Sequence, residues 1–458
     1  MNNLIGITIL VILTLLVIRQ IKVWKLRVFL SPGFYFGFLW MLGVVGIMIF
    51  ANAELIPLAA PEHINELMSF IGFTGLCFLI LTKKGYSTIN HEAVSVEYTS
   101  WKIYKVLSIL LISVAIFEFV RLGANFNMGN MRAMIHETVA NRSILVSYVE
   151  VVAIAISIWA GYKAMKLIVL GGKQHILTIL FLVLPLLSNL IFSMSKGGRV
   201  DFVYCFSYYL IGAVLSLPIN KKLSNLKKPI IVISLSAVII MAFISGVASQ
   251  RAENSTGKLS DKEIFFEENY GGFLSVLYGP IEYMTESFIG YQYRRDDAVD
   301  LTQLGYGRYT LNGFINWTLP FAGQFGLGDA SIAKALDIYY DSQETYDFHR
   351  IAYFVVHSCY IPIVKDFGPR GAYVFIFILV YIAHWLFVRI QQRKRIVYST
   401  TFYLYFLFWE YWVKSNYYGT LSQSVLLPLY GFLIVDILNY CFTPRRQNTF
   451  TRMLGSNK

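Results

Sequence analysis

A short basic segment, Ser195-Lys196-Gly197-Gly198-Arg199, stands between two apolar runs of the sequence. Glycines let backbone N–H groups approach a ligand closely, and an arginine side chain can grip a phosphate through two parallel hydrogen bonds. The alternative interpretation is a tight turn whose charged side chains reach toward the membrane surface. Because the other connections on its predicted side are mostly acidic, the segment favours phosphate binding by Lys196, Gly197, Gly198 and Arg199.

Other arginines on the same predicted side could join this phosphate site. A lipid pyrophosphate lies at headgroup depth, where arginines at the ends of membrane spans would meet it. Taken singly, each is better explained as a headgroup or loop contact. Arg251 is the strongest of them because it follows directly on an apolar run. The set consists of Arg121, Arg132, Arg142, Arg251, Arg294, Arg295 and Arg308.

His357 is the histidine best placed for proton transfer, with Lys365, Asp366 and Arg370 following it. Near neutral pH an imidazole can accept the proton of an attacking hydroxyl, although a partly buried structural histidine is the simpler reading of this residue alone. No metal site is predicted, because the paired acids Glu267–Glu268 and Asp296–Asp297 have no neighbouring His or Cys. Walker A and dinucleotide-binding sequences are absent, so no cofactor is expected.

The elements that must position these residues are membrane helices. Of 458 residues, 56% are hydrophobic and only 14% charged, whereas soluble domains carry about a quarter charged residues. The sequence therefore predicts an all-α polytopic membrane protein of about eleven spans. The apolar runs lie at about residues 4–18, 34–50, 67–81, 106–120, 144–160, 176–192, 202–217, 230–247, 372–388, 397–413 and 425–440.

The basic residues predict the orientation, because cytoplasmic loops retain Lys and Arg. The connections after the first, third, fifth, seventh and ninth runs, together with the C-terminal tail, hold 23 of the 39 basic residues and 3 of the 27 acids. The N-terminus is thus expected outside and the C-terminus inside. The net charge of +12 is a topology signal, and no nucleic-acid partner is predicted.

A long outer segment, residues 248–371, separates the eighth and ninth runs within one membrane domain, 1–458. Loops of this length are usually functional or disordered, and its aromatic content argues against disorder. We expect short amphipathic helices on the outer membrane face. The apolar run 351–364 is predicted as a re-entrant or interfacial helix, because a full crossing would break the alternation of charge.

The spacing from His357-Ser358 to Gly368-Pro369-Arg370-Gly371 resembles the H-[NSQ]-x9-G-x-x-[GTV] pattern of O-antigen ligases and Wzy-type polymerases. The Asp366-Phe367-Gly368 core is similar to the oligosaccharide repeat-unit polymerases, as is the small–Gly–Arg turn ending at Arg199. The span number and the late outer loop agree over nearly the whole chain. An R-x10-G match at Arg294 and Gly305 is expected by chance and carries no weight.

The resemblance implies a GT-C-like, metal-independent membrane glycosyltransferase of the bacterial cytoplasmic membrane. It would polymerise undecaprenyl-pyrophosphate-linked repeat units into O-antigen or capsule at the outer face, beside a flippase and a chain-length regulator. Arg199 and Arg251 would hold the donor pyrophosphate, and His357 would orient or deprotonate the acceptor hydroxyl. Arg350 or Arg370 would bind the acceptor, loop aromatics would stack on sugars, and Asp366 or Glu267 is the alternative base.

Three other functions stay open. An O-antigen ligase shares the histidine pattern and the spans, and only the Asp-Phe-Gly context favours a polymerase. A flippase or transporter for the same lipid-linked sugars would show internal repeats and ionisable residues at mid-membrane. Few ionisable residues lie within the runs, and no repeat is visible. A structural scaffold fits the long outer loop and its arginines least well.

Overall fold

The protein is helical in the computed structural model, as the sequence predicts. The structure describes residues 3–56, 60–82, 95–96, 101–121, 144–170, 176–196, 199–216, 261–270, 278–298, 304–306, 360–392, 395–396, 434–435, 437–438 and 441. The helices are α1 (Asn3–Trp24), η1 (Lys25–Leu30), α2 (Pro32–Asn52), α3 (Pro61–Leu81), α4 (Trp101–Arg121), α6 (Ile144–Leu170), α7 (Ile176–Lys196), α8 (Arg199–Leu215), α10 (Asp261–Tyr270), α11 (Tyr278–Ala298) and α14 (Tyr360–Gln392). The strands β1 (Ser95–Val96) and β2 (Arg395–Ile396) pair in parallel.

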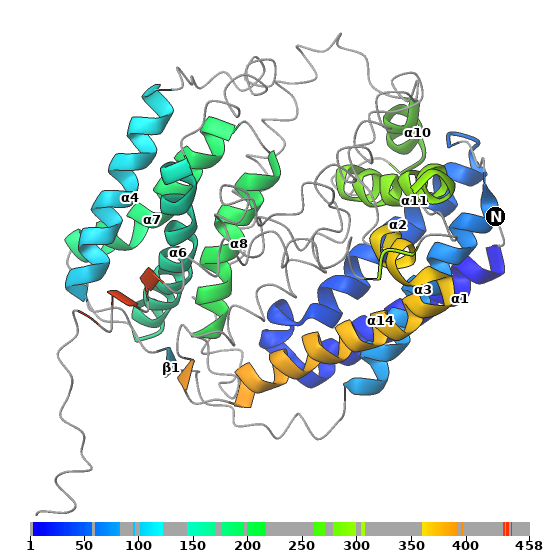
Figure 1. Ribbon diagram of the computed structural model, residues 1–458, viewed down its shortest axis with the longest axis horizontal. Helices are drawn as coiled ribbons and strands as arrows, with labels where there is room; N and C mark the ends of the chain where they lie inside the picture. The colour runs from blue at the N-terminus through cyan, green and yellow to red at the C-terminus, as the bar shows by residue number, and fades with distance from the viewer. Residues whose placement is uncertain are drawn as a thin grey trace, which may run out of the picture.

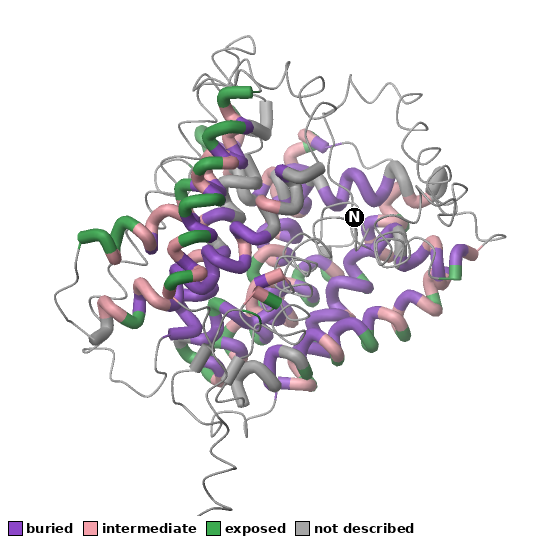
Figure 2. The backbone as a smooth tube through the Cα atoms, turned by 60° about the vertical axis from the view of Figure 1, so that its left-hand side comes forward, coloured by how far each residue is buried: buried purple, intermediate pink, exposed green. Residues whose placement is uncertain are grey.

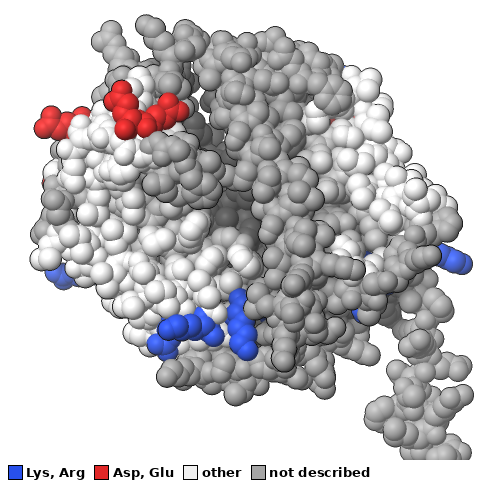
Figure 3. Space-filling view, turned by 180° about the vertical axis from the view of Figure 1, so that it is seen from behind, with Lys and Arg blue, Asp and Glu red and all other residues white. Residues whose placement is uncertain are grey.

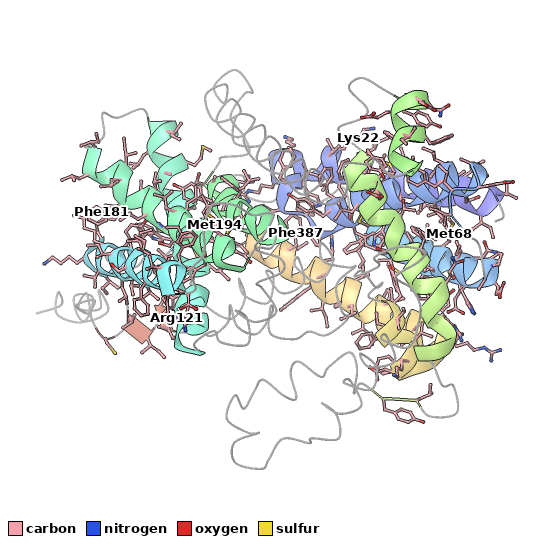
Figure 4. All side chains as sticks on the ribbon, turned by 90° about the horizontal axis from the view of Figure 1, so that it is seen from above. Lys22, Met68, Arg121, Phe181, Met194 and Phe387 are labelled. Atoms are coloured by element: carbon pink, nitrogen blue, oxygen red, sulfur yellow. The ribbon has the colours of Figure 1, made fainter. Side chains whose placement is uncertain are left out.

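The helices form two groups that lie side by side (Figures 1 and 4). In one group, α6 packs on α8 and α4 packs on α7. In the other, α1, α2, α3, α11 and α14 pack together, and α10 covers the end of α2 through Phe50 and Phe266. The short helix η1 contacts α8 and so joins the groups. Seen from above, Phe181 and Met194 lie in the first group and Met68 in the second (Figure 4).

Six described helices are long and apolar enough to cross a membrane. They are Leu4–Trp24, Pro32–Asn52, Pro61–Leu81, Trp101–Arg121, Ile176–Met194 and Ile363–Trp385. Eight of the predicted apolar runs fall on helices, since α6 and α8 occupy two more of them. The runs 230–247 and 397–413 lie outside the described residues, and 425–440 lies almost wholly outside them, so the total of eleven spans stays a prediction.

The outward faces of the helices are apolar. On α1, Leu4, Ile7, Val11 and Leu15 are each more than half exposed, while Leu13 on the opposite face is fully buried. Figure 2 shows this division, with exposed residues along the outer sides of the helices and buried ones between them. A surface helix of a water-soluble protein exposes polar side chains instead, so these apolar outward faces are suited to lipid.

Several contacts agree with the predicted topology. The ends of α1 and α3, both predicted inside, meet where Arg19 Nε donates to the carbonyl oxygen of Thr82 at 2.7 Å. Strands β1 and β2 join the connection after α3 to the one after α14, and both were predicted on the inner side. On the face drawn in Figure 3, acidic side chains gather at one end and basic ones at the other. This separation is what the positive-inside rule predicts.

Helix α14 is two helices joined by a reversal of the chain at Gly368. The Tyr360 hydroxyl bonds Thr74 at 2.9 Å, and the Tyr373 hydroxyl bonds Ser69 at 2.7 Å. In a straight helix Tyr360 would lie about 20 Å before Tyr373 along the direction of α3. Instead it bonds a residue farther along α3, so the segment 360–367 runs against α3 and the chain then turns back. The described part of the 351–364 run, residues 360–364, therefore agrees with the predicted re-entrant helix.

The outer segment departs from the prediction in one respect. Its helix α11 does not rest only on the membrane face, because Ile281, Met284 and Phe288 are buried against α2. Phe288 packs edge-on to Trp40, near the middle of α2, with ring centroids 5.6 Å apart. The close approach is possible because α2 presents glycines where the two helices touch. At Gly43 a Cβ atom would lie 3.2 Å from the Met284 carbonyl oxygen.

Candidate functional site

The structure describes only part of the predicted site. Asp366 and Arg370 are described with their side chains, on either side of the reversal in α14. Lys196 ends α7 and Arg199 begins α8, so only two residues of the chain separate these helices; Arg294 belongs to α11. The other predicted site residues lie outside the described part of the chain: His357, Arg251, Arg132, Arg142, Arg350, Gly197 and Gly198.

The reversal of α14 forms a compact tip, which we define as residues 365–371 with the segment 304–306 bound to it. The backbone N–H of Gly305 donates to the carbonyl oxygen of Lys365 at 3.2 Å. The backbone N–H of Tyr306 donates to the backbone carbonyl oxygen of Asp366 at 3.1 Å. These two bonds satisfy carbonyl groups that a helix leaves without partners at its C-terminal end. A segment about sixty residues earlier in the chain therefore completes the tip.

Gly368 makes the tip possible. Its backbone has φ 66° and ψ 170°, a conformation that essentially only glycine adopts. This residue is the first glycine of the Gly368-Pro369-Arg370-Gly371 pattern on which the family resemblance depends. The pattern thus has a physical reason in this chain, because any side chain at this position would strain the reversal.

We expect Gly368→Ala to destabilise the tip by about 1–3 kcal/mol. The loss comes from the backbone and not from crowding, because a Cβ atom here would meet nothing closer than Leu304 Cδ2 at 3.8 Å. Thermal unfolding of the purified protein and protease cleavage near residue 368 would measure the effect. Gly72→Ala is the matched control, because Gly72 lies within α3 and a Cβ atom there makes an ordinary contact. Equal stability of the two variants would contradict the assigned conformation.

The side chains of the tip divide into buried and exposed ones. Asp366 has no solvent exposure, and Phe367 stacks on Phe375 with ring centroids 4.5 Å apart. Arg370 is exposed and Lys365 is half-buried. The Asp366 side chain is therefore not open to a substrate in this structure, as its predicted direct role requires, whereas Arg370 is accessible to a ligand.

A second polar cluster joins α3 to α11. The Tyr291 hydroxyl donates to Glu66 Oε1 at 2.5 Å, and Arg295 approaches both carboxylate oxygens of Glu66 at 3.3 Å. The Arg295 and Glu66 side chains are only 11% and 22% exposed. Burial, followed by the Glu66 charge, raises the pKa of Tyr291 well above its usual value. The phenol therefore stays protonated and remains a donor to Glu66 at physiological pH.

Glu66 and the tip lie on the same side of a layer of stacked rings. Phe70 contacts Tyr360 and Tyr373, with ring centroids 5.6 and 4.9 Å away. Glu66 precedes Phe70 by one helical turn. The tip precedes Tyr373 on a helix that runs parallel to α3, so it too projects beyond the rings on the Glu66 side. The structure thus gathers charged groups from α3, α11 and α14 at one end of this helix group.

The turn between α7 and α8 belongs to the other helix group. A buried polar track leads toward it, in which Asn189 Nδ2 donates to Ser157 Oγ at 2.7 Å. Ser193 then lies 3.0 Å from the thiol of Cys205, which connects α7 to α8. These bonds fix the helices on both sides of Lys196 and Arg199. The two predicted halves of the site, this turn and the tip, are therefore built on different helix groups.

Sequence reasoning missed Glu66 and Tyr291, and it treated Arg295 only as one of several outer arginines. Glu66 follows Glu62 and His63 in a polar stretch that matches no motif. Its partners come from more than two hundred residues away, on a helix whose packing against α2 and α3 the sequence does not reveal. The usable signal is that this carboxylate directly precedes the apolar run 67–81 on the same helix.

Among the residues that the structure describes, no three His, Cys, Asp or Glu side chains lie close enough together to hold a metal ion. Comparisons of the chain with protein-family models, with curated proteins and with solved structures find no match.

Proposed function

We propose that this protein is a membrane glycosyltransferase that polymerises undecaprenyl-pyrophosphate-linked oligosaccharide units into a surface polysaccharide. The observation that carries the proposal is the conformation of Gly368. The motif shared with O-antigen polymerases and ligases coincides here with a reversal of the chain that requires glycine at this position.

Three further features support the proposal. The chain has several helices suited to lipid, as an enzyme with a lipid-linked substrate needs. The tip carries the exposed Arg370 beside the half-buried Lys365, which suits an anionic substrate. The acidic and basic ends of the molecule favour an orientation with the tip on the outer side of the bacterial cytoplasmic membrane (Figure 3).

In the proposed reaction, a hydroxyl oxygen of the acceptor unit forms a bond to the anomeric carbon of the donor glycan. The bond from that carbon to the pyrophosphate oxygen breaks, and undecaprenyl pyrophosphate leaves with the electron pair. His357 accepts the hydroxyl proton. Arg199 and Arg251 stabilise the charge that develops on the leaving group, and Arg370 binds the acceptor. Asp366 holds the tip in place without touching either substrate.

The test is the surface-glycan ladder of a strain that lacks this protein, complemented with wild type or with single variants. We expect the deletion strain to carry single repeat units, and the wild type to restore the ladder. His357→Ala, Arg199→Ala and Arg370→Ala are each expected to reduce polymer at least tenfold, because each removes a group that acts on a substrate. Lys163→Ala, on the inner half of α6, is the control and should restore the ladder fully.

Two other outcomes would contradict the proposal. Long polymer that accumulates on its lipid carrier and never reaches its anchor would indicate a ligase. Repeat units trapped on the cytoplasmic face would indicate a flippase. Immunoblots of each variant in membranes separate loss of activity from loss of protein.

A further inference from the structure

Tyr306 combines three features that rarely occur together. Its side chain is 81% exposed, the highest value among the exposed large hydrophobic and aromatic residues in the described part of the chain. Its backbone is left-handed, with φ 49°. Its own N–H is bonded to Asp366 at the tip of α14. A mobile loop tip would explain the exposure alone, but it would not explain a fixed backbone.

The two residues before Tyr306 are also held against the tip. Gly305 is buried and donates to the carbonyl oxygen of Lys365. Leu304 lies against Gly368 at the reversal itself. An aromatic residue in the left-handed region is a genuine outlier, and such strain persists where the surrounding structure enforces it, often at functional sites. The fold therefore holds an exposed aromatic ring at a conformational cost.

The surroundings of the ring indicate which ligand it fits. The same tip presents the exposed Arg370 and the half-buried Lys365, which donate hydrogen bonds and carry positive charge. A sugar ring offers an apolar face of C–H groups that packs on an aromatic ring, and hydroxyl or acidic groups at its rim for such donors. An apolar partner would gain nothing from these charges on the same tip.

We propose that Tyr306 is the stacking platform of a glycan-binding subsite at the tip of α14, with Arg370 at its rim. The subsite takes a single sugar ring of the glycan that the proposed polymerase extends, and to that extent the inference rests on the proposed function. Because Tyr306 is bonded to the tip through its backbone N–H, the backbone keeps its position when the side chain is changed. A substitution of the Tyr306 side chain therefore tests the contribution of the ring by itself.

The experiment measures binding of a soluble probe by the full chain in nanodiscs. The probe is the oligosaccharide repeat unit released from the host's own surface polysaccharide by mild acid. Tyr306→Phe keeps the ring and is expected to bind within about twofold of wild type. Tyr306→Asn removes the ring but tolerates the left-handed backbone, so it is expected to bind about tenfold more weakly with unchanged stability.

Tyr306→Leu distinguishes a sugar platform from a membrane anchor. Leucine enters a lipid interface but has no flat face for stacking, so we expect it to fail as Tyr306→Asn does. If Tyr306→Leu binds the probe like wild type, the residue is an apolar anchor and the inference is wrong. Absence of wild-type binding, or equal binding by Tyr306→Asn, would also overturn it. Tyr381→Leu is the matched control. Tyr381 is a tyrosine of α14 that is 51% exposed, and its substitution should leave binding of the probe unchanged.

The two proposals can fail separately. If the probe binds through Tyr306 while a deletion strain still makes full-length polymer, the subsite stands and polymerisation is wrong. If the deletion strain loses its polymer but Tyr306→Asn binds normally, polymerisation stands and the subsite is wrong.

Discussion

Substitution of Gly212 by leucine is expected to abolish accumulation of the folded protein. Helices α6 and α8 cross with their backbones in contact, and Gly161 and Gly212 lie at the crossing. A Cβ atom on Gly212 would overlap the carbonyl oxygen of Ile158, and one on Gly161 would overlap that of Tyr209. Because the overlapping atoms belong to the backbone, no rotation of a side chain can relieve the overlap. Small residues permit this kind of close approach between membrane helices.

The smallest change at this crossing should already be harmful. Gly212→Ala adds only the overlapping atom, and we expect it to cost on the order of 3 kcal/mol, because the helices must separate along their length. Size-exclusion profiles in mild detergent and thermal unfolding would measure the loss. Gly72→Ala again serves as the control and should match wild type or exceed its stability, since alanine favours a helix. A monodisperse, stable Gly212→Ala protein would mean that the helices lie farther apart than described.

Substitution of Glu66 by alanine is expected to have the second largest effect, a loss of about 2 kcal/mol. Removing one partner of a buried ion pair costs about 3–5 kcal/mol, because the remaining charge stays buried without compensation. The smaller value applies here because the Glu66 side chain is 22% exposed and water can reach it. Tyr291→Phe removes one hydrogen bond and should cost about 1 kcal/mol. Thermal unfolding and proteolysis of α11 would report both changes.

A double variant tests whether the unpaired charge causes this loss of stability. In the double variant Glu66→Leu with Arg295→Met no charge is left unpaired, so it should be more stable than Glu66→Ala alone. Glu282→Gln is the control, at a half-exposed carboxylate on α11, and it should leave the stability unchanged. A Glu66→Ala protein as stable as wild type would show that α11 is held by its apolar contacts alone.

Local properties of the sequence determined much of the helical architecture. Apolar runs such as 34–50 and 176–192 became α2 and α7 because a bilayer-spanning segment must satisfy its own backbone hydrogen bonds, which only the helix allows. Pro32 and Pro61 begin their helices because a proline at the first helical position loses no hydrogen bond. The helix boundaries at Lys196 and Arg199 and the helical segment before Gly368 likewise follow from spacing and charge in the sequence.

Tertiary structure decided how distant residues meet, and no local pattern contains that information. Glu66 became a partner of Tyr291 and Arg295 because glycines on α2 let α11 pack against the helices, and helix packing depends on matching surfaces. Asp366, which the sequence offered as a base, is buried, and the segment 304–306 is bonded to the backbone of Lys365 and Asp366. The same bonds hold the exposed Tyr306 at the tip. Hydropathy specifies which segments are helices, whereas shape complementarity specifies which side chains they bring together.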